Sequence, residues 1–175
     1  DGSNGFQING IDARDASGQS VSSAGDVNGD GFDDIIIGAV NDNDSTATGE
    51  SYVVFGAKDW SSQSLDLSSL DGSNGFQING IDARDASGRS VSSAGDVNGD
   101  GIDDIIIGAS GANGATGESY VVFGAEDWSS QSLNLSDLDG SNGFQINGIV
   151  RNDYSGTSVS SAGDVNGDGI DDIII

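Results

Sequence analysis

The sequence predicts an all-β protein made of four-stranded antiparallel blades of the β-propeller type. The first reason is repetition, because one unit starts at Asp1, Asp71 and Asp139, with periods of 70 and 68 residues. The second is that each unit holds four short segments with strand-like patterns, and no segment keeps helical periodicity beyond about two turns. Four strands in a period above about 40 residues are typical of propeller blades, whereas a β-solenoid, the alternative, has much shorter coils.

The copies are nearly identical. Residues 1–40 match residues 71–110 at 37 of 40 positions, and residues 139–175 match residues 71–107 at 32 of 37. The difference in length between the first two copies falls within Val40–Gly49 and the corresponding Ser110–Gly117. The length of this segment therefore varies between units, while the rest of the unit is nearly constant.

The strands of the first unit follow from its patterns. Gly5–Asn9 alternates Phe6 and Ile8 with polar residues, and Ser20–Ala24 is a second short strand. Asp34–Ala39 contains three consecutive isoleucines, which suit a strand covered on both faces. Glu50–Gly56 is the fourth strand of this reading, and Ser61–Leu70 fits either an extended segment or a short helical turn.

Composition excludes several classes of function. The chain has 29 acidic and 5 basic side chains, a formal charge of −24, and no His, Cys, Pro or Met. Such a charge disfavours nucleic acid and anionic lipid, and no apolar run approaches the roughly 20 residues of a membrane span. Without His or Cys, zinc–thiolate sites and the commonest general base are missing. Oxygen ligands remain, and these suit hard cations such as Ca²⁺.

The strongest chemical motif is the nine-residue loop DVNGDGFDD, Asp26–Asp34, which recurs at Asp96–Asp104 and Asp164–Asp172. Acidic or amide side chains stand at positions 1, 3, 5 and 9, and position 7 offers a backbone carbonyl, which is the oxygen spacing of a calcium loop. An EF-hand would need Glu at position 12, where Ile37, Ile107 and Ile175 stand. A calcium loop within a β-hairpin is therefore predicted, the alternative being a solvated acidic turn without an ion.

The predicted calcium sites number three, one per loop. Asp33, Asp103 and Asp171 are expected behind the ligands or toward solvent, because neighbouring strand residues point to opposite faces. The candidate ligands are Asp26, Asn28, Asp30, the Phe32 carbonyl and Asp34; Asp96, Asn98, Asp100, the Ile102 carbonyl and Asp104; and Asp164, Asn166, Asp168, the Ile170 carbonyl and Asp172.

The segments SVSSAGDVNGDGFDDIIIGA (Ser20–Ala39) and GESYVVFG (Gly49–Gly56) resemble FG-GAP repeats, the blades of the integrin α-subunit propeller, which also occur in large bacterial surface proteins. The motif's first Phe-Gly is replaced here by Ser17-Gly18, and its Gly-Ala-Pro by Gly38-Ala39-Val40. The resemblance implies the same calcium ligands and an innermost strand before each acidic loop.

That strand order divides the chain into four parts. Residues 1–19 would be the outer strand of a preceding blade and its connection, 20–89 and 90–157 two blade repeats, and 158–175 the first two strands of a third. Eleven strands do not make whole blades, so we expect an incomplete ring or part of a longer array. Its open faces would be covered by neighbouring repeats or by copies of the same chain.

The expected function is a calcium-binding, non-enzymatic repeat protein with a structural or adhesive role outside the cell. The alternative is a module that binds a glycan or protein ligand through the variable loops opposite the acidic ones, with Tyr154 as a contact. An enzyme is disfavoured because the candidate pair Asp33 and Asp34 recurs in every unit. Trp60 and Trp128 are expected to pack the blades, and Asn43 and Asn134 begin glycosylation sequons.

Overall fold

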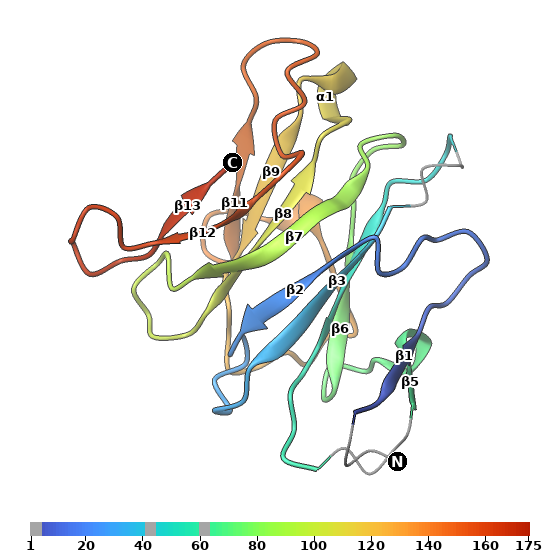
Figure 1. Cartoon of the computed structure of the whole chain (residues 1–175), viewed down its shortest axis with the longest axis vertical. Coiled ribbons are helices and arrows are strands. Elements are labelled where there is room, and N and C mark those ends of the chain that lie inside the picture. The colour runs from blue at the N-terminus through green and yellow to red at the C-terminus, as the bar shows by residue number, and fades with distance from the viewer. Residues whose placement is uncertain (1–4, 41–44, 60–63) are drawn as a thin grey trace.

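A computed structural model of the chain describes residues 5–40, 45–59 and 64–175. It is almost entirely β, as predicted, and four sheets follow one another along the molecule (Figure 1). The described part forms no closed ring, also as predicted. None of its helices is long and apolar enough to cross a membrane.

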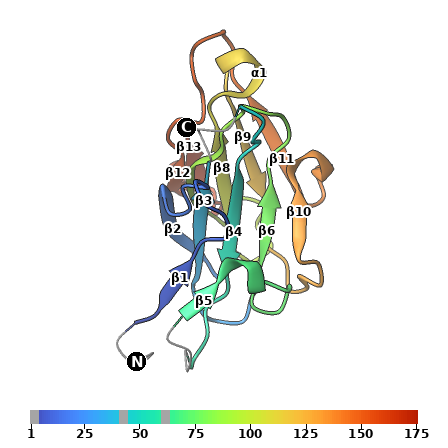
Figure 2. The same ribbon diagram turned by 90° about the vertical axis from the view of Figure 1, so that its right-hand side faces the viewer.

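The first blade is an antiparallel sheet in the order β6-β4-β3-β2, with a fifth strand added beyond β6 (Figure 2). Its inner hairpin joins β2 to β3 through the first acidic loop, with Val21 opposite Ile37. The second blade has the order β11-β9-β8-β7, and only the hairpin β12-β13 of the third is present. The strands of these sheets are β2 (Ser20–Gly25), β3 (Asp34–Ala39), β4 (Glu50–Val54) and β6 (Gly75–Asn79); β7 (Ser87–Gly95), β8 (Asp104–Ala109), β9 (Glu118–Val122) and β11 (Gly143–Asn147); and β12 (Ser160–Gly163) and β13 (Asp172–Ile174).

The expected count of eleven strands is wrong, because the described residues contain thirteen. The two extra strands are β5 (Ser64–Asp66) and β10 (Ser132–Asn134), each followed by a 3₁₀ turn, Leu67–Ser69 and Leu135–Asp137. The segment Ser61–Leu70, for which the sequence allowed either an extended or a helical conformation, is extended over Ser64–Asp66 and forms a 3₁₀ turn over Leu67–Ser69. β10 pairs parallel with β6 of the preceding blade, and β5 pairs in the same way with β1 (Gln7–Asn9). Each of these three-residue strands exists only through a distant partner, which local patterns do not reveal.

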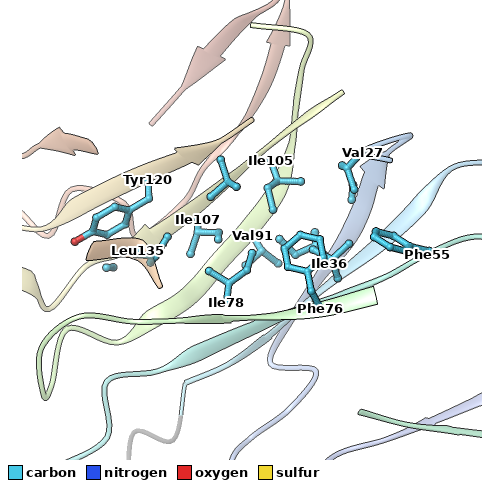
Figure 3. Close-up of a cluster of buried hydrophobic side chains, with 14 of the residues drawn as sticks. Val27, Ile36, Phe55, Phe76, Ile78, Val91, Ile105, Ile107, Tyr120 and Leu135 are labelled. Carbon is cyan, nitrogen blue, oxygen red and sulfur yellow. The ribbon is translucent and has the colours of Figure 1, made fainter. Parts of the chain in front are cut away.

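The hydrophobic core lies in layers between successive sheets. The largest layer joins the first two blades, with Ile36 and Phe76 of the first packed in one cluster with Ile107 and Tyr120 of the second (Figure 3). Ile37 belongs to a separate cluster on the opposite face of the same sheet. The isoleucine run is therefore covered on both faces, as its composition predicted.

Neighbouring blades approach closely at glycines. A Cβ atom added to Gly38 would lie 2.0 Å from the carbonyl oxygen of Gly88, and one added to Gly108 would lie 1.9 Å from that of Gly156. Only a residue without a side chain fits such a contact. Gly38 and Gly108, which follow the isoleucine runs of the first two units, thus set the spacing between blades.

Candidate metal loops and the blade interface

The acidic loops lie together at one end of the blades, where each inner hairpin turns (Figure 1). In the first loop, the carboxylate of Asp26 accepts hydrogen bonds from the backbone N–H groups of Asp30 (3.0 Å) and Gly31 (2.8 Å). The Asn28 side-chain oxygen also accepts from Asp30 N–H, at 3.0 Å. Gly31 has a φ of 91°, in the left-handed region that glycine adopts without strain. The side chains at positions 1 and 3 thereby fold over a tight turn.

Position 9 has a different environment. Asp34 is 1% exposed, and its two carboxylate oxygens accept hydrogen bonds from the backbone N–H groups of Val27 (3.0 Å) and Gly56 (2.7 Å). Burial raises the pKa of the Asp34 carboxyl to about 6, although the two backbone hydrogen bonds lower it. Through these two hydrogen bonds, Asp34 connects the start of the acidic loop to the residues that follow β4.

The second and third loops repeat this framework. Asp96 accepts hydrogen bonds from the backbone N–H groups of Asp100 (3.1 Å) and Gly101 (2.9 Å). The buried Asp104 accepts from those of Val97 and Gly124, at 2.9 Å each. Burial likewise raises the pKa of Asp104 to about 6. In the third loop, Asp164 accepts from Gly169 at 2.9 Å, and this hydrogen bond is the main cause of its lowered pKa. Three copies of one loop structure therefore stand in a row.

The donor set of each loop consists of oxygen atoms only, which fits a hard cation such as Ca²⁺ and not a soft metal. Asn28 and Asp30 are brought together by a 3.1 Å hydrogen bond from the amide to the carboxylate. Across residues 5–40, 45–59 and 64–175, no three acidic side chains already stand close enough to hold a metal ion between them. Binding would thus require the side chains at positions 1, 3 and 5 to exchange part of their contacts within the loop for the ion.

A contact between blades was missed in the sequence. The Asp103 carboxylate accepts a 2.8 Å hydrogen bond from the backbone N–H of Asp26, and Asp171 does the same for Asp96 at 3.1 Å. Asp33 is exposed. In the second and third units, the aspartate at loop position 8, beside the predicted ligand at position 9, therefore contacts the backbone of the first ligand residue of the preceding loop. Its recurrence in all three units was the available signal.

The prediction that tryptophan packs the blades is confirmed for Trp128. The Trp128 ring stacks on Phe76 of the first blade, with ring centres 3.9 Å apart and planes 10° apart. Its indole N–H donates to the Val27 carbonyl at 3.1 Å. Trp60 and the sequon residue Asn43 lie outside the described residues, and the Asn134 side chain is exposed on β10.

Loops at the other end of the blades carry unusual backbone conformations. Every non-glycine residue with positive φ in the described part lies there, and the set is Arg14, Ala16, Arg84, Ala86, Asn113, Ala115, Asn152 and Tyr154. The loop of the third unit, residues 148–156, exposes the most apolar surface. In it Ile149 is 92% exposed, and Val150 and Tyr154 are more than half exposed. The length difference between units, with the short helix α1 (Ala112–Ala115), falls at this end too (Figure 1).

Comparison with known families agrees with the fold. The FG-GAP repeat model matches residues 17–54 and 87–122, which hold the first three strands of the two complete blades and their acidic loops. No curated protein sequence matches the chain. The first matched segment contains Ser20–Ala39 and most of Gly49–Gly56, the motifs that suggested the resemblance, and the sheets have the antiparallel order expected of such blades. This chain therefore contains two FG-GAP repeats, one in each of its complete blades.

Proposed function

We propose that the chain is a calcium-binding, non-enzymatic repeat protein with a structural or adhesive role at the cell surface or in an extracellular matrix or filament. The observation that carries this proposal is the row of three acidic loops with one shared hydrogen-bond framework. FG-GAP repeats are typical of extracellular or surface proteins, and a module-type site with a Kd of roughly 10⁻⁴–10⁻³ M would suit calcium concentrations outside cells.

In each loop, the ion would be held by the residues at positions 1, 3 and 5, by the carbonyl at position 7 and by the aspartate at position 9. It would offset the repulsion among carboxylates gathered in one turn of a chain with a formal charge of −24. Because Asp26 is also bonded to Asp103 of the next blade, order in the loop would extend to the blade interface. Calcium would thus stiffen the array.

The proposal is tested by thermal melting of the metal-free protein in calcium, in magnesium and in chelator, with metal analysis of each sample. We expect three Ca²⁺ per chain and a higher melting temperature in calcium. Filling each site at about ten times Kd would add about 1.4 kcal/mol per site. Magnesium should stabilise much less, because it requires tighter octahedral geometry. An unchanged melting temperature after verified removal of calcium would contradict the proposal.

The proposed partners are further repeats or copies of the same chain. Val91 is 5% exposed beneath the neighbouring blade, whereas Val21, at the same position of the first unit, is 62% exposed. Covering that apolar side chain is favourable by the hydrophobic effect. A blade face of this kind is therefore suited to pack against another blade.

A second candidate function is binding of a glycan or protein ligand by the loops opposite the calcium loops. It is favoured by the gathering of positive-φ residues and exposed apolar side chains there, because backbone strain is often kept at binding sites. Glycan and extracellular-protein arrays probed with the wild type and with Tyr154→Ser would test it. Loss of a bound signal in the variant would support it, and no signal from the wild type would exclude it.

A further inference from the structure

A cavity of about 440 Å³ opens at the calcium-loop end, between the first two blades. Four segments border it: the first acidic loop with Asn28 and Asp30, Phe55 after β4, the turn at Asp71, and residues Glu126–Ser129 after the second blade's third strand. Its volume lies in the range of roughly 300–1,000 Å³ found for small-molecule sites. It lies at the opposite end from the loops of the second candidate function.

The aromatic wall of this cavity is fixed in place. Trp128 lines it while stacking on Phe76, and its N–H is bonded to the Val27 carbonyl. The backbone N–H of Ala125 donates to the same carbonyl at 3.0 Å. Gly72 contacts this segment so closely that an added Cβ would lie 2.5 Å from the Trp128 carbonyl oxygen. The indole plane is thus held before any ligand arrives, which lowers the entropy lost on binding.

The polar rim of the cavity consists largely of acceptors. One Asp71 carboxylate oxygen accepts from both the backbone N–H (2.9 Å) and the hydroxyl (2.7 Å) of Ser73. Asp30 accepts from Phe32 N–H (2.9 Å) and from the Asn28 amide (3.1 Å). These carboxylates are therefore positioned groups with lone pairs left over. Glu126 and Asp127 stand exposed at the rim.

We propose that this cavity binds the uncharged pyranose ring of a glycan. Such a ring has a C–H face that would lie on the Trp128 indole, whose π face is electron-rich. Its hydroxyl groups would donate to the carboxylates of Asp71, Glu126 and Asp127. A sugar acid would be repelled by the same carboxylates. A cationic ligand would be attracted by the same carboxylates, and arginine amide is therefore the competing probe in the experiment.

The test uses the whole chain carrying Trp60→Phe, so that tryptophan fluorescence reports Trp128 alone. The methyl glycosides of glucose, galactose and mannose are titrated in calcium and in chelator, with glucuronic acid and arginine amide as charged probes. We expect saturable binding of at least one glycoside, with a Kd on the order of 1 mM, and none of glucuronic acid.

Two variants locate the site. Glu126→Ala combined with Asp127→Ala should weaken binding about tenfold without lowering the melting temperature, since both side chains are exposed. Asp59→Ala is the matched control, because Asp59 holds the position of Asp127 in the first unit, and it should leave binding unchanged. No saturable response to any glycoside, preferred binding of arginine amide, or full affinity in the double variant would each overturn the proposal. The inference goes beyond calcium binding, and metal analysis of the same samples keeps the two outcomes separate.

Discussion

The carboxylate of Asp103 accepts a hydrogen bond from the backbone N–H of Asp26, which precedes it by 77 residues. The return contact is a 3.3 Å hydrogen bond from Asp103 N–H to the Asp26 carbonyl. Gly25 makes room for this carboxylate, because a Cβ there would lie 2.3 Å from its oxygen. The first residue of an acidic loop is thus positioned by the next blade, and the same arrangement joins Asp171 to Asp96.

We predict that Asp103→Ala destabilises the chain by about 1–2 kcal/mol, because a partly buried backbone N–H loses a charged acceptor. Asp33→Ala removes the same charge at the same position of the first unit, where the side chain is exposed, and should change stability much less. Urea unfolding of both variants in calcium would measure the difference. Equal losses in the two variants would contradict a role at the blade interface.

Asp30→Ala tests ligation directly. If Asp30 serves mainly as a calcium ligand, its removal should lower the melting temperature in calcium and have little effect in chelator. Calcium bound per chain should fall from three to two. Ser69→Ala is a suitable control, since its hydroxyl bonds only the nearby Asp66 carbonyl on an exposed turn. A loss of stability that is the same in chelator as in calcium would show that Asp30 acts only through its hydrogen bonds within the loop.

Gly38→Ala tests the spacing of the blades. The new methyl group would lie 2.0 Å from the Gly88 carbonyl oxygen, so the two blades would have to separate. Overpacking of this kind typically destabilises by about 1–3 kcal/mol or more. Gly10→Ala is the control, because its methyl group would meet only the Ser17 side chain, at 3.0 Å. Denaturant unfolding should show a loss for Gly38→Ala that is clearly greater than for Gly10→Ala.

Much of the fold could be predicted from local sequence. The isoleucine run of Asp34–Ala39 indicated a strand buried on both faces, and the acidic loop before it indicated a hairpin; both are present. The short strands β5 and β10 were beyond such reasoning. Ser132–Asn134 is three residues long, and its pairing with Gln77–Asn79 depends on how two blades sit together.

The candidate site was predictable in part. Spacing alone selected Asp26, Asn28 and Asp30, and the structure gathers these side chains over one turn. Spacing also selected Asp34, but the burial of its side chain and the hydrogen bond that it accepts from Gly56 N–H depend on where β4 ends. The role of Asp103 depends on the neighbouring blade. Local pattern thus identifies the residues of a turn, while contacts between turns require the assembled sheets.

The last prediction concerns Asp85, a buried carboxyl at the end of the blades opposite the acidic loops. Asp85 is 8% exposed, and burial raises its pKa, helped by the nearby charges of Asp82 and Glu118. Since the folded state binds this proton more tightly than the unfolded chain, the stabilisation is present below the unfolded pKa of about 3.9 and is lost as the pH rises through the folded pKa.

Asp85→Asn should therefore be more stable than the wild type at pH 7, and the two should converge near pH 4. The amide oxygen keeps an acceptor for the Asp82 N–H, which donates to Asp85 at 3.1 Å. Asp15→Asn is the control, because Asp15 accepts the same bond from Asp12 at 2.7 Å but is only half-buried. Urea unfolding in chelator at both pH values would separate these effects from metal binding. A variant Asp85→Asn that is less stable than the wild type at pH 7 would show that the charged carboxylate is favourable there.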